Sequence, residues 1–114
     1  MKGTISNNTT TPDTVVQAAE ALGARIRAAR TRRKMRREDL AERSGLSRTA
    51  IEAVEAGKLT TGLGTYLRAL WAMGLTDPVA LIADPGLDRD GLALELNVQT
   101  KRVKIGRPGL DNDF

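Results

Sequence analysis

The side chains of this sequence that could do chemistry are mainly arginines and lysines, and they cluster in one stretch of the chain. Residues 25–58 contain eleven Lys or Arg and five Asp or Glu, which gives a net charge of +6. Guanidinium and ammonium groups bind phosphates and carboxylates, so the cluster permits binding to nucleic acid or to an anionic membrane. Solvated helix faces explain the charge equally well. Residues 75–95 carry one Arg and five acids, a net charge of −4, so a basic body is followed by an acidic arm.

Catalytic and metal-binding side chains are scarce. The chain has no His and no Cys, which removes the commonest general base, the commonest metal ligand and thiolate chemistry. It also lacks a Gly-rich phosphate loop and a paired-acid constellation. We therefore expect no enzyme activity, no cofactor and no metal site. Aromatic residues make up 3% of the chain, which disfavours RNA binding through stacked bases.

Membrane and export signals are also missing from the sequence as given. No apolar run approaches the ~18 residues that a membrane-spanning helix needs. The first residues are polar and lack the apolar core of a signal peptide. We expect no membrane partner and a cytoplasmic protein.

The spacing of apolar residues predicts the helices that position the basic side chains. A helix from residue 13, capped by Asp13 or Thr14, has apolar residues every three or four positions, and Gly23 can bend or split it. Further helices are predicted at about 37–43, 47–57 and 63–73. Gly45 suits the positive φ of a helix end, and the Ser47 hydroxyl can cap the helix that follows.

The C-terminal third gives weaker signals. Asp77 followed by Pro78 predicts the start of a short helix over 78–83. Residues 87–96 form a further candidate helix. Its leucines at 92, 94 and 96 recur every second residue rather than every third or fourth, which is not typical of a helix. Residues 100–105 alternate basic and apolar side chains, which fits a short strand or an extended arm. We expect residues 1–12 to be a disordered tail and residues 106–114 a flexible one.

Several spaced elements between residues 22 and 75 agree with one known domain. They are Leu40-Ala41, Gly45-Leu46-Ser47, Ile51, Glu55-Ala56-Gly57, Leu67 and Leu70. Together they resemble the helix-turn-helix domain of the Xre family, the phage-repressor-like transcription regulators. The resemblance implies an all-α, five-helix DNA-binding domain over residues 13–75. Residues 76–105 are then a C-terminal extension for dimerisation or partner binding, with a short helix and a possible strand or arm.

The resemblance also implies which side chains meet DNA bases. Ile51 and Val54 hold the helix that begins at Ser47, and its opposite face enters the major groove. The expected base-contacting residues are Arg48, Thr49, Glu52 and Ala53. Arg48 can donate two hydrogen bonds to guanine, and Glu52 can accept one from a cytosine amine. An ion pair between Glu52 and Arg48, four residues apart on one helix, explains the acid equally well.

A second layer of expected contacts is to DNA phosphates. The expected phosphate-contacting residues are Arg36, Arg37, Ser47, Lys58, Thr60 and Thr61. In the family a small capping residue usually precedes the second helix, and Gly often stands in the turn before it. Arg36 and Lys34 occupy these positions here, so the start of the second helix is expected to be shifted or irregular. The resemblance further implies a structural salt bridge between Arg30 and Glu55.

One recognition helix reads about half of a site, so we expect a homodimer on a palindromic operator in double-stranded DNA. Residues 75–85 and 91–105 resemble segments of regulators encoded beside HipA-type kinase toxins. Two functions stay open on this basis. One is an autonomous repressor, and the other is an antitoxin that binds a toxin kinase and represses its own operon.

Overall fold

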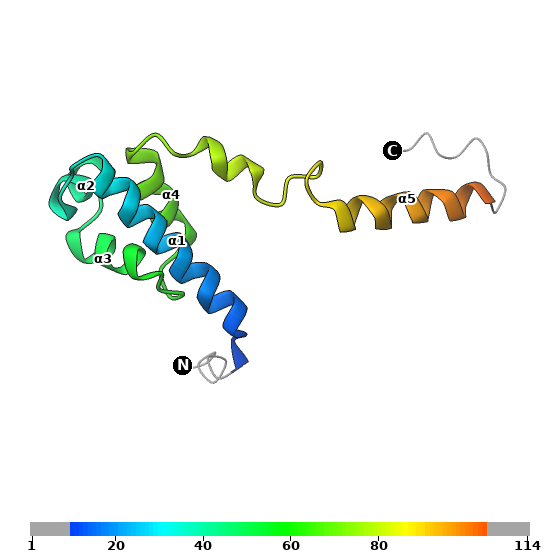
Figure 1. The fold of residues 1–114 in the computed structure, drawn as a ribbon, viewed down its shortest axis with the longest axis horizontal. Coiled ribbons are helices and arrows are strands. Elements are labelled where there is room, and N and C mark those ends of the chain that lie inside the picture. The colour runs from blue at the N-terminus through cyan, green and yellow to red at the C-terminus, as the bar shows by residue number, and fades with distance from the viewer. Residues whose placement is uncertain (1–9, 105–114) are drawn as a thin grey trace. The chain divides into compact units, whose positions relative to one another are not determined.

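The computed structural model describes residues 10–104 of the chain (Figure 1). In chain order its main elements are α1 (Asp13–Arg32), α2 (Arg37–Ser44), α3 (Arg48–Ala56), α4 (Leu63–Ala72), the 3-10 helix η2 (Asp77–Leu81) and α5 (Arg89–Lys104). The all-α prediction is therefore confirmed. Most of the predicted N-terminal tail, and all of the predicted tail at 106–114, lie outside the described residues.

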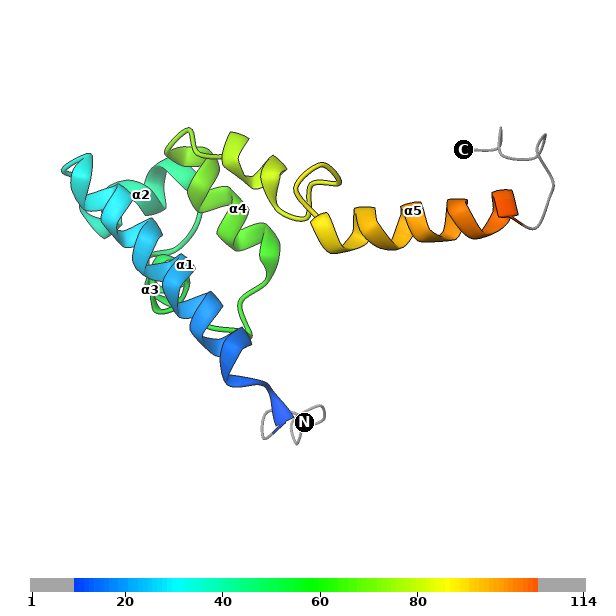
Figure 2. The same cartoon turned by 45° about the vertical axis from the view of Figure 1, so that its right-hand side comes forward.

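The chain divides into two compact units, with the boundary between Thr76 and Asp77. In the first unit α3 lies in contact with α1, α2 and α4, and α2 also contacts α4 (Figures 1 and 2). The helix at the centre of this arrangement is the one whose outer face is the candidate DNA-binding surface.

The start of α1 differs from the sequence prediction. Pro12, rather than Asp13 or Thr14, is the N-cap residue, and no side-chain hydrogen bond caps the helix. Pro12 has φ −62° and ψ 144°, so the chain is extended just before the first helical turn. Gly23 does not bend or split the helix, which runs unbroken from Asp13 to Arg32.

The connection between α1 and α2 is regular despite its unusual residues. Lys34 adopts a left-handed conformation with φ 56° in the turn where the resembling family often has glycine. Arg36 is the N-cap residue of α2, and its backbone N–H donates to the Asp39 carboxylate at 2.8 Å. The predicted shift or irregularity at the start of α2 is wrong, since α2 begins at Arg37. The Asp39 carboxylate makes the half of a capping box that requires no acceptor on residue 36, and the Asp39 backbone N–H donates to the Arg36 backbone oxygen at 3.0 Å.

The turn between α2 and α3 forms as predicted. Gly45 ends α2 with φ 73°, and Gly57 ends α3 with φ 71°. These left-handed conformations carry a steric penalty in residues with a Cβ atom. Ser47 caps α3, since its Oγ accepts a hydrogen bond from the Ala50 backbone N–H at 3.0 Å.

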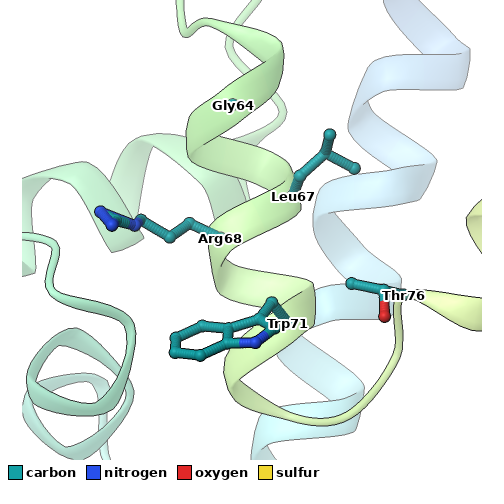
Figure 3. A pocket seen from close by; sticks show the side chains of 5 residues that line it. All are labelled: Gly64, Leu67, Arg68, Trp71 and Thr76. Carbon is teal, nitrogen blue, oxygen red and sulfur yellow. The ribbon is translucent and has the colours of Figure 1, made fainter.

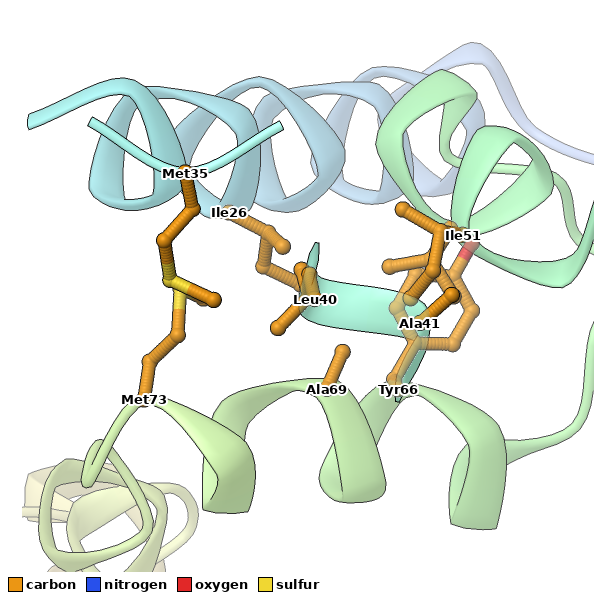
Figure 4. Packing of buried hydrophobic residues seen from close by; sticks show 9 residues of the cluster. Ile26, Met35, Leu40, Ala41, Ile51, Tyr66, Ala69 and Met73 are labelled. Carbon is orange, nitrogen blue, oxygen red and sulfur yellow. The ribbon is translucent and has the colours of Figure 1, made fainter. Parts of the chain in front are cut away.

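A single apolar core holds the four helices of the first unit together. Figure 4 shows side chains of this core filling the space between α1 and α4. Leu40, Ile51 and Val54 are among those with no exposed surface. The remaining members of the cluster are Ile26, Met35, Ala41, Tyr66, Ala69 and Met73. The core is aliphatic apart from Tyr66, whose hydroxyl donates to the Lys58 backbone oxygen at 2.8 Å.

The second unit departs most from the sequence prediction. The short helix predicted over 78–83 is present as the 3-10 helix η2, which begins at Asp77 and ends at Leu81. The strand or extended arm predicted at 100–105 is wrong for residues 100–104, which form the last turn of α5. Ile105 lies outside the described residues. The alternation of basic and apolar residues in this segment spans too few positions to outweigh continuation of the preceding helix.

Candidate nucleic-acid interface

The two faces of α3 differ sharply in exposure. Ile51 and Val54 point into the core, whereas Arg48, Thr49 and Glu52 are exposed. Successive residues of an α-helix are rotated by about 100°, which places positions 48, 49, 52 and 53 on one side and positions 51 and 54 on the other. The four residues predicted to contact bases therefore share one face, although Ala53 is half-buried.

Two glycines bring α1 and α3 into backbone contact. A Cβ atom on Gly23 would lie 2.6 Å from the backbone oxygens of Val54 and Glu55. A Cβ atom on Gly57 would overlap the backbone of Ala19 and Glu20. Because no side chain fits between the helices, the end of α3 is fixed directly against the middle of α1.

A buried ion-pair cluster joins three helices behind the exposed face. Arg30 on α1 binds Glu55 on α3 through Nε at 2.6 Å and through Nη2 at 3.1 Å. Arg30 Nη1 also donates to the backbone oxygen of Met35 at 2.8 Å. The Arg30 and Glu55 side chains are 9% and 3% exposed, so the bidentate pair is shielded from water. The two residues expected to form a structural salt bridge thus lie in contact.

Arg37, predicted to contact phosphate, belongs to the same cluster. Its Nε donates to Glu55 Oε1 at 3.1 Å, and a third of its side chain is exposed. The cluster therefore contains two guanidinium groups and one carboxylate, with a net charge of +1. The sequence analysis missed this contact, because positions 37 and 55 are brought together by the fold rather than by a helical repeat.

Arg48 is held by two carboxylates on the exposed side of the unit. Its Nε donates to Glu52 Oε2 at 3.2 Å, and its Nη1 lies 3.7 Å from Glu38 Oε2 on α2. The pair with Glu52 is the one that the i,i+4 spacing allows. The pair with Glu38 was not predicted, since it joins two helices across the turn.

The other residues predicted to contact phosphate lie at the starts of α2 and α3 and in the segment after α3. The Arg36 side chain binds Asp39, and these hydrogen bonds lower the pKa of Asp39 below its ordinary value. Lys58 and Thr60 are exposed after the end of α3, and Thr61 is half-buried. Ser47 Oγ is an acceptor for the cap of α3, so its hydroxyl proton stays available for donation.

Arg68 on α4 is a basic residue near the turn that sequence reasoning did not single out. Its guanidinium is 3.8 Å from the position that a Cβ atom on Gly45 would occupy. It lines a shallow hollow on the outer side of α4 with Gly64, Leu67, Trp71 and Thr76 (Figure 3). An arginine one turn from an exposed tryptophan marks this side of α4 as a second candidate surface.

A short tight turn between two packed helices, with the second helix exposed on one face, defines the helix-turn-helix class of DNA-binding domain. Residues 21–81 match the family model of a helix-turn-helix domain, which covers more than half of the chain. The chain belongs to this family. No curated protein and no solved structure matches it. Among residues 10–104, none of the helices is both long and apolar enough to cross a membrane.

Proposed function

We propose that this DNA-binding protein is a sequence-specific transcriptional repressor of the Xre type that acts as a homodimer on a palindromic operator. The observation that carries the proposal is the exposed face of α3, opposite the buried Ile51 and Val54. A helix presented in this way fits the major groove, where each base pair shows a distinct pattern of donors and acceptors. A two-fold dimer places two such helices about one turn of DNA apart.

Arg48 and Thr49 are the proposed principal base readers. Both lie in the first turn of α3, where helix-turn-helix proteins make many of their base contacts. Arg48 donates to the two acceptors of guanine, and Thr49 contacts a base edge or a thymine methyl group. Glu52 accepts from a cytosine amine once Arg48 has moved to its base, and Ala53 offers only a methyl contact.

Phosphate contacts are proposed for Arg36, Arg37, Ser47, Lys58, Thr60 and Thr61. Arg37 has the strongest physical case, because Glu55 is shared by two arginines and balances only one of their charges. The partly exposed Arg37 guanidinium lies in the first turn of α2, where the helix dipole also favours an anion. A phosphate there would complete the charge balance of the cluster.

The outer side of α4 is the proposed core of the dimer interface. Leu63 and Trp71 are 70% and 61% exposed, and Leu67 lies between them on the same side of the helix. Large apolar side chains grouped on one exposed face are typical of association surfaces. Trp71 is the single tryptophan of the chain, so its fluorescence should respond to dilution if this face is covered in the dimer.

The proposal is tested with duplexes selected from a random pool by the full-length protein and with scrambled duplexes of the same composition. Arg48→Ala is expected to cost about 1–3 kcal/mol on the selected duplex and to relax preference at one base pair. Lys58→Ala is expected to weaken binding to both duplexes and to flatten the salt dependence by about one phosphate contact. Arg89→Ala, an exposed charge on α5, is the matched control.

Equal losses for Arg48→Ala on selected and scrambled DNA would contradict the base-reading role. An unchanged salt slope for Lys58→Ala would remove this lysine from the phosphate contacts. Selection of non-palindromic single half-sites by the full-length protein would contradict the homodimer.

An antitoxin that binds a HipA-type kinase is the second candidate function. It is favoured by the second unit, whose large apolar side chains are exposed beside a surplus of acidic residues. Apolar patches with a polar rim are common at protein interfaces. Co-purification of a kinase with the full chain, lost when residues 77–114 are removed, would support this function. A chain that retains the kinase without these residues would contradict a partner-binding role for the unit.

A further inference from the structure

Arg48 forms ion pairs with acidic residues on two different helices, and its pair with Glu38 is called the clamp below. Glu52 follows it by one turn on α3, and Glu38 reaches it from the first turn of α2. The three side chains are about half exposed, at 55% for Arg48, 51% for Glu38 and 49% for Glu52. All three groups are therefore accessible to DNA, and the guanidinium that would read a base is already paired in the free protein.

The two acids differ in what DNA binding would do to them. Glu52 shares the exposed face of α3 with Arg48 and can follow it to a base pair. Glu38 lies on α2, so its ion pair with Arg48 has to separate when the guanidinium moves into the groove. The cost of breaking an exposed ion pair corresponds to about a two- to fivefold change in affinity. A guanine at the right position offsets that cost with two hydrogen bonds.

Random DNA offers no such compensation. An unclamped arginine at the protein–DNA boundary binds the nearest phosphate, which raises affinity for every sequence alike. An arginine retained by Glu38 contributes little to that attraction. Glu38 therefore weakens binding to DNA that lacks the correct base more than binding to DNA that has it.

We propose that Glu38 is a specificity-determining residue that acts through Arg48 by holding it away from phosphates until the correct base is present. This inference rests on the proposed base-reading role of Arg48. Glu38 itself touches no base and is a positioning residue.

The test compares Glu38→Gln with Glu42→Gln in the full-length protein. Glu42 lies one turn later on α2, is exposed, and has no side-chain ion pair among the described residues, so it controls for the loss of one negative charge. Relative to Glu42→Gln, Glu38→Gln is expected to raise affinity for a scrambled duplex about two- to fivefold. The salt dependence on that duplex should steepen by about one contact, and the ratio of selected to scrambled affinity should fall.

A double-mutant cycle with Arg48→Ala separates the clamp from a general charge effect. In the Arg48→Ala background, Glu38→Gln and Glu42→Gln should give equal affinities on both duplexes. Thermal unfolding of each variant verifies that the fold is retained.

These measurements distinguish failure of the clamp from failure of the base-reading role of Arg48. If Arg48→Ala lowers selectivity but Glu38→Gln and Glu42→Gln behave alike in both backgrounds, the clamp is overturned and the proposed function stands. If Arg48→Ala leaves selectivity unchanged, the base-reading role itself fails, and the clamp fails with it.

Discussion

The two units of the chain differ in how far their apolar side chains are buried. In the first unit Leu40, Ile51 and Val54 are completely buried. In the second, no residue between 77 and 101 is buried, and Leu94 is 67% exposed. Leucine content therefore says little about burial. The helices of the first unit pack against one another, whereas α5 has a low amphipathic character and takes part in none of the main helix–helix contacts of the described residues.

This contrast bears on what stabilises each helix. Isolated helices of about 12–15 residues are marginal in water, and most helices in proteins depend on burial of an apolar face. The short α2 and α3 satisfy that condition through the shared core. The longer α5 does not, so mutations should have large effects in the first unit and small ones in the second.

The largest contrast is expected for buried and exposed glutamates. Glu55→Ala leaves Arg30 buried without its carboxylate, and loss of one partner of a buried ion pair costs about 3–5 kcal/mol in unfolding free energy. Glu95→Ala, on the exposed surface of α5, should change it by less than about 0.5 kcal/mol. Chemical denaturation of both variants measures the difference. Similar losses for the two would contradict the difference in burial between the two units.

Leucines should show the same contrast without any change of charge. Leu40→Ala opens a cavity in the core and should cost about 2–5 kcal/mol. Leu94→Ala should lie within about 0.5 kcal/mol of the unaltered chain. Denaturation midpoints at several protein concentrations provide the measurement. A large, concentration-dependent loss for Leu94→Ala would show that α5 is buried in an oligomer.

The smallest expected effect concerns pH. Burial raises the pKa of Tyr66 above its ordinary value of 10.0. The unfolded chain then releases this proton at lower pH than the folded chain, so the associated stability is complete below pH 10.0 and is lost as pH rises through the folded pKa.

Tyr66 is the single tyrosine, so ultraviolet absorbance reports its titration alone. Tyr66→Phe should flatten the fall in stability over this interval. A titration midpoint at or below the ordinary value would contradict the raised pKa.

Local signals in the sequence predicted α3 and the turn before it well. The capping hydroxyl of Ser47 and the left-handed Gly45 act within a few residues, so their effects are readable from neighbours in the chain. The alternation of buried and exposed positions in α3 is likewise a property of helical spacing. The positions of Arg48, Thr49 and Glu52 on one face follow from that spacing.

The features that sequence reasoning missed depend on contacts between helices. The sequence predicts that Gly23 can bend or split α1, whereas in the structure its missing side chain lets the backbones of α1 and α3 touch. The contacts of Arg37 with Glu55 and of Arg48 with Glu38 join residues on separate helices, and no local repeat encodes them. The strand or arm predicted near the C-terminus was wrong for a local reason, because a short alternating segment resembles a strand even when it continues a helix.

The backbone contact at Gly23 and Gly57 has a consequence for engineering. It fixes the position of α3 together with Glu55 and the core residues, and none of these lies on the outward face. The exposed positions 48, 49 and 52 can therefore be randomised as a library while the scaffold stays constant. Under the proposed base-reading role of this face, altered-specificity variants should be obtainable with little loss of folding when each new residue at position 48 is screened together with position 38.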